Sequence, residues 1–231
     1  TRKELSPTML KENIKVLAPL DIESKGTWIG VNEHGLLLSL SNAYQPDRES
    51  YLSNDSRGKL VLDTLKKCKD SEEAKSFICK RINEQKFKFF NLFCISPKKG
   101  FFIKYNGAFN SFVLPNSTTL FHYSSGYDNG KVKEIRELRL KQLFKDSNPE
   151  TISKSLKRIK QACCDHFKEN IPSDNSICMH GSPRRTISST IFVIGNKLQE
   201  YFCEYLNGYP CEQKYKKFFF KKYKQNFVGV K

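Results

Sequence analysis

The amino-acid sequence predicts an α+β protein in which two mainly antiparallel sheets are stacked and covered by pairs of helices. Three observations predict this fold: a hairpin pattern at residues 26–42, a helix pair followed by a strand meander at residues 57–114, and a second helix pair followed by strands at residues 132–206. Strands in antiparallel blocks and helices in pairs form layered domains, because each apolar face must be buried by a neighbouring layer. No internal repeat or low-complexity linker divides the chain, and we expect a single domain over residues 1–231.

The N-terminal part of the chain predicts one short strand and one hairpin. Residues 1–15 are polar and contain a Ser-Pro pair, which favours an extended or turning segment over a strand. Residues 16–20 predict a short edge strand that Pro19 ends, because proline cannot donate to a strand ladder. In the hairpin, two short apolar runs flank a polar turn that ends in Gly35. The second run, residues 36–40, is almost entirely apolar, so we expect its strand to be covered on both faces.

Two helices are predicted after the hairpin, because apolar residues recur there with helical spacing. The first runs from about residue 57 to residue 67. The second begins at Ser71, where Ser71 or Asp70 caps the helix and the following acidic residues suit the positive end of its dipole. The apolar residues that we expect to face the core are Leu60, Val61, Leu62, Leu65 and Cys68 in the first helix and Ala74, Phe77, Ile78 and Ile82 in the second.

A change from helical to strand-like sequence marks a β meander. β-favouring runs occupy residues 87–96, 100–105 and 108–114, and turn residues separate them. The second turn contains Asn106-Gly107, and Asn-Gly is the strongest short signal for a hairpin. Residues 118–123 predict a fourth strand.

The second half of the chain returns to helical spacing and then ends in strands. Two helices are predicted, with their apolar stripes at Val132, Ile135, Leu138 and Phe144 and at Ile152, Leu156, Ile159, Cys163 and Phe167. Strands follow at residues 176–179, 186–194 and 199–206. We interpret the basic, aromatic tail at residues 211–231 as an element that packs its Phe side chains on the domain while its Lys side chains point outward.

The formal net charge of +16 raises the question of an anionic partner such as nucleic acid, phospholipid or a phosphorylated ligand. The 40 cationic residues comprise 31 Lys and only 9 Arg, although Arg is the better bidentate reader of phosphate. We therefore expect nucleic acid not to be a main partner. A binder of nucleic acid or of anionic membranes that uses the tail at residues 211–231 remains an alternative.

Eight cysteines raise the question of disulfides or metal ligands. No Cys-x-x-Cys pair occurs, and the groupings Cys163-Cys164-x-His166 and Cys178-x-His180 lack the spacing of common zinc sites. We expect reduced cysteines in the core, no metal site and no cofactor. The longest apolar run is far shorter than the roughly 18 residues of a membrane span, and no signal peptide is apparent, so we expect a soluble, cytoplasmic protein.

Three ordered motifs give the chain a resemblance to a known family. They are Gly-Thr-Trp-Ile-Gly-Val-Asn-x-x-Gly at residues 26–35, Asn42, and Ser-Arg-Gly at residues 56–58, with Asp21 shortly before the first. Bacterial members share further blocks: Ser124-Ser125 before a helix with Arg136 and Arg139, and the stretches at residues 176–180 and 186–190. With these motifs the chain resembles the NRDE family, which includes the eukaryotic transport and Golgi organisation protein 2, over nearly its whole length.

The resemblance implies a four-layer αββα sandwich of the N-terminal-nucleophile-hydrolase type. In that fold a Cys, Ser or Thr at the mature N-terminus starts a central strand and its own amine acts as the base. The family signature Asn-Arg-Asp-Glu matches residues 1–4 only at Arg2 and Glu4, so we expect the preceding strand and its Cys to be missing from this chain. Thr1 lies one strand too late to replace that nucleophile, and we assign no catalytic residue.

Five residues are candidates for a ligand pocket: Arg2, Glu4, Trp28, Asn42 and Arg57. Each has an ordinary structural alternative. Arg2 and Glu4 would equally suit a solvated tail, Trp28 a core position and Asn42 a turn. Arg57 lies at a helix start, where the dipole favours anions, so it predicts either a bound anion or a structural salt bridge.

The resemblance implies a protein that binds or carries a small metabolite of the haem or acyl-lipid type, with a role in secretion or Golgi organisation. The alternative is an amide hydrolase or acyltransferase whose nucleophilic Cys lies upstream of this chain. Whether the protein is an enzyme stays open at this point. The ligand and the oligomeric state do not follow from the sequence.

Overall fold

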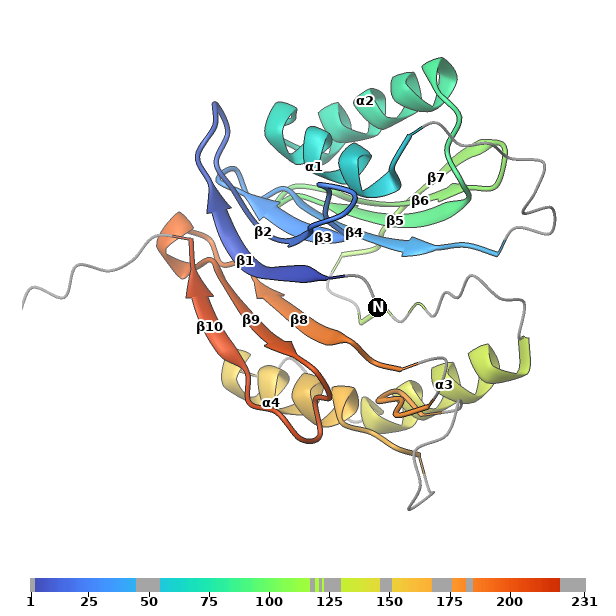
Figure 1. Cartoon of the computed structure of the whole chain (residues 1–231), viewed down its shortest axis with the longest axis vertical. Coiled ribbons are helices and arrows are strands. Elements are labelled where there is room, and N and C mark those ends of the chain that lie inside the picture. The colour runs from blue at the N-terminus through green and yellow to red at the C-terminus, as the bar shows by residue number, and fades with distance from the viewer. Residues whose placement is uncertain are drawn as a thin grey trace, which may run out of the picture.

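A computed structural model describes residues 3–44, 55–116, 119–120, 122, 130–145, 151–167, 176–181 and 185–220. Its elements form four layers, in which two sheets lie face to face and a helix pair covers the outer face of each (Figure 1). This arrangement confirms the predicted α+β sandwich. The first sheet lies under α1 and α2, and the second lies against α3 and α4 (Figure 1).

The first sheet has seven antiparallel strands in the order β1 to β7 along the chain. They are β1 Glu4–Leu10, β2 Val16–Asp21, β3 Ile29–Asn32, β4 Leu37–Asn42, β5 Phe90–Ile95, β6 Gly100–Tyr105 and β7 Phe109–Val113. The second sheet contains β8 Ser188–Val193, β9 Phe202–Asn207 and β10 Lys216–Phe219 in the order β10-β9-β8. The hairpin at residues 26–42 and the meander are therefore confirmed.

The helices begin and end close to the predicted residues. They are α1 Arg57–Lys67, α2 Ser71–Glu84, α3 Gly130–Leu143 and α4 Ile152–Cys163. Asp70 caps α2, because its Oδ1 accepts from the backbone N–H groups of Glu72 and Glu73 at 2.9 and 3.0 Å. None of these described helices has the length and apolar character needed to cross a membrane.

Two apolar clusters hold the layers together. The larger lies between the first sheet and the helices α1 and α2, and it includes the completely buried Leu36, Leu60 and Phe90. The smaller lies between the two sheets, where Leu17 and Val31 of the first meet Tyr201, Cys203, Tyr205 and Phe220. Side chains from both faces of the first sheet are thus buried, as expected for a central layer.

Residues 4–10 form a strand, so the prediction of an extended or turning segment over residues 1–15 is wrong there. The strand pairs with β2, and its register shifts between Leu5 and Thr8. Within this irregularity Ser6 and Pro7 lie opposite the single residue Pro19. A bulge at a sheet edge tolerates residues that cannot donate a ladder hydrogen bond, which is how a strand accommodates the Ser-Pro pair.

Three further predictions are corrected. β2 lies between β1 and β3 and is therefore not an edge strand. Residues 176–178 form bends and residue 179 is irregular, so the predicted strand at residues 176–179 is absent. Leu138 and Ile152, which were expected on buried stripes, are 60% and 59% exposed. Of the predicted strand at residues 118–123, residues 119, 120 and 122 are described and form no strand, and the other three lie outside the described residues.

The basic tail folds into the second sheet as far as it is described. β10 pairs with β9, Phe220 is buried between the sheets, and Lys216 and Lys217 are exposed. The Lys217 ammonium lies 3.6 Å from the centroid of the Phe202 ring, a cation–π contact. This part of the tail therefore uses its aromatic residues for packing, as predicted, and residues 221–231 lie outside the described part.

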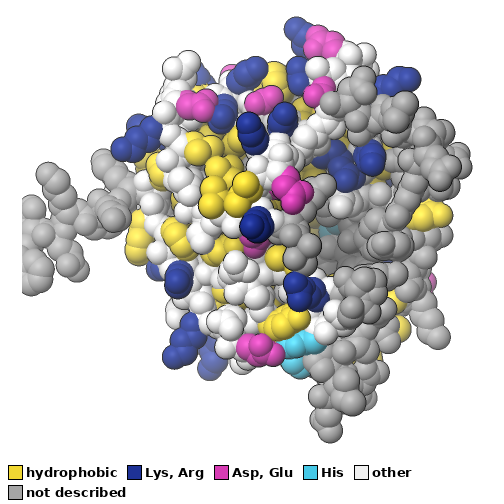
Figure 2. Space-filling view, viewed as in Figure 1, with side chains coloured by type: hydrophobic (Ala, Val, Ile, Leu, Met, Phe, Trp, Pro, Cys, Tyr) yellow, Lys and Arg dark blue, Asp and Glu magenta, His cyan; other side chains and the backbone are white. Residues whose placement is uncertain are grey.

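The cationic side chains do not gather into one patch on the face shown in Figure 2, where Lys and Arg are scattered among Asp and Glu. Four of the eight cysteines are buried, namely Cys68, Cys94, Cys178 and Cys203, and all eight are free thiols. Burial raises the pKa of the Cys68 and Cys203 thiols to about 12. These thiols therefore stay protonated at neutral pH, as expected for core cysteines.

Candidate functional site

The two glycine-containing motifs of the sequence meet in space. The backbone N–H of Thr27 donates to the carbonyl of Gly58 at 3.0 Å. A Cβ atom on Gly26 would lie 2.3 Å from the carbonyl carbon of Gly58, so no other residue fits there without moving the backbone. The hairpin thus contacts the first turn of α1 directly, which explains why both motifs carry glycine.

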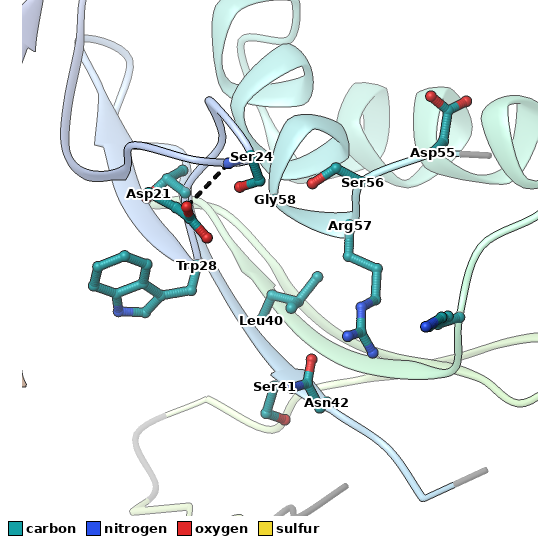
Figure 3. A pocket seen from close by; sticks show the side chains of 12 residues that line it. Asp21, Ser24, Trp28, Leu40, Ser41, Asn42, Asp55, Ser56, Arg57 and Gly58 are labelled. Atoms are coloured by element: carbon teal, nitrogen blue, oxygen red, sulfur yellow. Dashed lines mark hydrogen bonds between the residues drawn. The ribbon is translucent and has the colours of Figure 1, made fainter. Parts of the chain in front are cut away.

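A cavity of about 730 Å³ lies beside this contact. Residues from the loop after β2, from β4, from the start of α1 and from just before β5 line it (Figure 3). The described lining residues are Asp21, Ser24, Thr27, Trp28, Leu40, Ser41, Asn42, Asp55, Ser56, Arg57, Gly58 and Lys88.

Arg57 reaches from the start of α1 towards the end of β4 (Figure 3). Its Nη1 donates to the carbonyl of Phe89 at 2.7 Å, and the same carbonyl accepts from the backbone N–H of Ala43 at 3.2 Å. The guanidinium is therefore held beside the strand end that carries Asn42. Ser56 caps the helix, with its Oγ accepting from Lys59 N at 3.4 Å.

Asp21 and Trp28 lie at the other end of the cavity. Oδ1 of Asp21 accepts from the backbone N–H groups of Glu23 and Ser24 at 2.9 and 3.0 Å, which fixes the tight loop before the Gly-Thr-Trp motif. Trp28 is half-buried and lies on the far side of Leu40 from Arg57 (Figure 3). It thus presents an apolar surface to the cavity while remaining accessible.

A smaller cavity of about 200 Å³ shares Asp21 and Trp28 with the larger one. Lys3, Glu4 and Ile187 complete its described lining. The hydroxyl of Tyr205 donates to Oε1 of Glu4 at 2.7 Å, across the space between the two sheets. Burial first, and then this hydrogen bond, raise the pKa of Tyr205 above its usual range, so the phenol remains a donor.

Four of the five predicted pocket residues line these adjoining cavities. Trp28, Asn42 and Arg57 line the larger one, Glu4 lines the smaller one, and Trp28 belongs to both. Arg2 lies outside the described residues. Arg57 donates to a backbone carbonyl, a contact that the sequence did not predict, and its two predicted alternatives, a bound anion or a salt bridge, stay predictions.

Sequence reasoning missed several other lining residues. Lys88 lies between Phe87 and Phe89 in a β-favouring run, and only the fold places it in the same cavity lining as Arg57. Asp55 lies two positions before Arg57, and no motif marked it. Asp55 also lies 4.0 Å from the Arg81 guanidinium of α2, so it links the two helices. Ser41 precedes Asn42 in β4 and was detectable only as its neighbour.

The side chains around the larger cavity suit the binding of a polar group attached to an apolar body. Arg57, Lys88, Asn42 and the serine hydroxyls supply hydrogen-bond donors, while Trp28 and Leu40 supply apolar surface. No His or Cys occurs among its described lining residues, so no pairing of a nucleophile with an imidazole base is formed by them.

Several solved structures share an overall likeness with the chain at low sequence identity. Penicillin V acylase from Agrobacterium tumefaciens is 14% identical with a TM-score of 0.49, and the alignment covers 86% of this chain and 68% of that one. The N-acylethanolamine-hydrolyzing acid amidase orthologue of Caenorhabditis elegans is 14% identical with a TM-score of 0.48, covering 88% and 79%. A variant of the conjugated bile acid hydrolase from Clostridium perfringens is 17% identical with a TM-score of 0.34, and this chain spans 47% of its length.

Comparison by sequence identifies the family of the chain but no individual curated protein that matches it. None of the curated proteins matches the chain. The sequence model of the family described as Transport and Golgi organisation 2 matches residues 1–209, which include the hairpin, the start of α1 and all four described pocket candidates. Because that match covers most of the chain, the protein belongs to the Transport and Golgi organisation 2 family.

Proposed function

We propose that the protein binds an acyl compound with a carboxylate or amide head group in the larger cavity. The observation that supports this proposal is the joint lining of a space of about 730 Å³ by Arg57, Asn42 and Trp28. Sites for small ligands have volumes of roughly 300–1,000 Å³ and combine apolar walls with a few convergent polar groups.

The head group would lie at the Arg57 end of the cavity. The guanidinium is planar and cationic, a geometry that matches a carboxylate or amide oxygen, and its Nη1 donates to Phe89 O, which holds it at this end. Asn42 and Ser41, at the end of β4, add neutral donors beside it. The acyl chain would then extend over Leu40 towards Trp28, where the polar lining gives way to apolar surface.

Haem, the other ligand type implied by the family resemblance, fits this lining less well. Proteins hold haem iron by an axial His, Cys, Met or Tyr side chain. The described residues around the larger cavity include none of these four types. An acyl compound needs only the donors and the apolar wall that are present.

Trp28 makes the proposal directly testable, because it is the only tryptophan of the chain. We expect long-chain fatty acids or N-acyl amides to change its fluorescence saturably. Arg57→Gln should weaken binding at least tenfold, since a hydrogen bond to a charged group contributes about 1.5–3 kcal/mol. Lys59→Gln, which removes an exposed charge two residues further along α1, is the matched control and should bind as the wild type does.

The proposal fails if no acyl compound of the series changes the fluorescence of a folded protein. It also fails if Arg57→Gln and Lys59→Gln bind equally well. The melting temperature of each variant separates a binding loss from a loss of fold, because Arg57 also donates to Phe89 O. Haem binding that survives Arg57→Gln would support the haem alternative instead. Carriage of such a ligand would accord with the transport role named in the family description.

A second candidate function is amide hydrolysis or acyl transfer by a nucleophile that precedes Lys3. Lys3 and Glu4 line the smaller cavity, which shares Asp21 and Trp28 with the proposed ligand site. A Cys carried by residues before this strand would therefore lie near a bound acyl group. The N-terminal sequence of the native protein, followed by amidase assays of the protein and its Cys→Ala variant, tests this. Activity that does not depend on the Cys would count against it.

A further inference from the structure

Four side chains with metal-binding atoms converge beside one end of the second sheet. His166 follows α4, Cys178 and His180 lie in the segment before β8, and Cys211 lies in the connection from β9 to β10. One ligand atom from each of them lies within 4.8 Å of all the others. Segments separated by up to 45 positions in the sequence thus bring two imidazoles and two thiols together.

The separations match those of a tetrahedral zinc site. Zn–S bonds of about 2.3 Å and Zn–N bonds of about 2.0–2.1 Å place two sulfur ligands roughly 3.8 Å apart and a sulfur and a nitrogen roughly 3.5 Å apart. Cys178 Sγ and Cys211 Sγ are 3.6 Å apart. His180 Nε2 lies 3.5 Å from Cys178 Sγ and 3.1 Å from Cys211 Sγ. A metal ion would therefore need only small movements of the side chains.

The His180 imidazole is oriented as a metal-ligating histidine usually is. Nδ1 of His180 faces Oε1 of Glu212 at 3.4 Å, so its Nε2 is directed to the sulfurs. A carboxylate behind a histidine in this way fixes the ring and raises its basicity as a ligand. The Tyr209 ring stacks on His180 with centroids 3.8 Å apart. Nε2 of His166 is buried and has no hydrogen-bond partner, which is costly unless another species satisfies it.

Hydrogen bonds to backbone carbonyl groups hold the ligand-bearing segments in place. The carbonyl of Asp165 accepts from the N–H groups of Ile177 and Cys178 at 3.1 Å each. Ser176 Oγ donates to the carbonyl of His166 at 3.2 Å, and Cys164 Sγ donates to the carbonyl of Pro210 at 3.1 Å. These hydrogen bonds join the three ligand-bearing segments to one another close to the ligands, as expected for a preorganised metal site.

We propose that His166, Cys178, His180 and Cys211 bind one Zn²⁺ ion as a structural site. Thiolate and imidazole ligands in a tetrahedron select zinc over the oxygen-preferring ions. Two thiolates neutralise the charge of Zn²⁺, which suits a site where Cys178 is completely buried. Four protein ligands leave no open position for substrate, so the ion would join α4, the segment at residues 176–181 and the second sheet.

A disulfide between Cys178 and Cys211 is the competing use of this cluster. It would account for the two sulfurs but not for the pair of imidazoles, nor for the buried Nε2 of His166. The zinc site accounts for all four side chains and for Glu212 behind His180. The two possibilities differ in zinc content and in their response to reductant.

The first test is the metal content of the full chain, purified under reducing conditions from zinc-supplemented medium. We expect about one zinc ion per chain by elemental analysis. Cys178→Ser and Cys211→Ser should lose most of it, whereas the control Cys79→Ser, which changes a half-buried thiol of α2, should keep it. Likewise His180→Asn should lose zinc and His34→Asn, in the exposed β3–β4 turn, should not.

Two further measurements use the wild-type protein, so they do not depend on whether the variants fold. Co²⁺ added to the reduced wild-type protein should give the visible spectrum of a tetrahedral site with sulfur ligands, and Zn²⁺ should abolish it. Chelation should lower the melting temperature by roughly 5–10 °C relative to zinc at a hundredfold excess over Kd. A wild-type protein that takes up neither metal when reduced overturns the proposal, as does a Cys178–Cys211 disulfide that persists where zinc is available.

Discussion

The Tyr205 hydroxyl donates to Oε1 of Glu4 at 2.7 Å and so joins the two sheets. Glu4 begins β1 in the first sheet, and Tyr205 lies in β9 of the second. Their separation of 201 positions makes this a contact that only the folded chain forms. Because Glu4 also lines the smaller cavity, the hydrogen bond connects the packing of the sheets to the candidate site.

Tyr205→Phe is expected to destabilise the protein by about 1.5–3 kcal/mol, the net contribution of a hydrogen bond to a charged group. Urea unfolding checks this value. Tyr44→Phe is the control, since Tyr44 is 45% exposed at the end of the described N-terminal region, and its change should stay within about 0.5 kcal/mol. Equal stability of the Tyr205→Phe variant and the wild type would mean that the inter-sheet hydrogen bond is not formed in solution.

Gly26→Ala should disrupt the joint between the hairpin and α1. The added Cβ would lie 2.3 Å from the carbonyl carbon of Gly58 and 2.5 Å from the nitrogen of Lys59, both of which are backbone atoms. Overpacking typically costs about 1–3 kcal/mol, and we expect the upper end of that range because the obstructing backbone atoms cannot rotate aside as a side chain can. Gly130→Ala at the start of α3 is the contrasting variant, because nothing lies within 4 Å of its Cβ position. If thermal unfolding shows the two variants to be equally stable, Gly26 and Gly58 do not lie in close contact in the folded protein.

Asn32 ties the β3–β4 turn to the end of α1. Its Nδ2 donates to the carbonyls of Leu65 and Cys68 at 3.0 and 2.7 Å, and its Oδ1 accepts from the N–H groups of His34 and Leu36. The side chain is completely buried. Asn32→Ala should cost roughly 2–4 kcal/mol, because it leaves several buried backbone groups without partners. Asn110→Ala on exposed β7 is the control, and a similar loss for both would contradict the assignment.

Sequence reasoning predicted the elements whose signals are local. Helices α1 and α2 and the meander β5–β7 agree with periodicity, capping and turn residues, because these depend on neighbours a few positions away. Residues of the Gly-Thr-Trp and Ser-Arg-Gly motifs line the candidate cavity. Their physical reason, the close approach of Gly26 to Gly58, became visible only in three dimensions.

Features that depend on distant residues were missed. β1 was overlooked because a Ser-Pro pair argues against a strand, and the bulge opposite Pro19 that accommodates it is a property of the pairing. Leu138 appeared buried on helical spacing although α3 leaves it exposed. The cluster of His166, Cys178, His180 and Cys211 has no recognisable spacing, since three segments supply its members.

The Glu33 carboxylate provides a test by pH. Its Oε1 accepts from the backbone N–H of Lys15 at 3.0 Å, and its Oε2 lies 3.0 Å from the Lys15 ammonium. The backbone hydrogen bond is the main cause that lowers the pKa of Glu33, with the ammonium adding to it against the opposing effect of burial. Because the folded pKa lies below the unfolded value of about 4.3, the carboxylate stabilises the fold above that pH and loses this contribution as the pH falls through the folded pKa.

Glu33→Gln should therefore destabilise the protein at pH 7 by about 0.5–1 kcal/mol, since the amide can still accept from Lys15 N but cannot pair with its ammonium. The difference between variant and wild type should shrink below pH 4 and also at high salt, which screens the ion pair. Urea unfolding from pH 3 to pH 7 measures it. Glu134→Gln, at an exposed position of α3, should differ little from the wild type at any pH. A Glu33→Gln deficit that is constant with pH would show that Glu33 acts through packing and not through its charge.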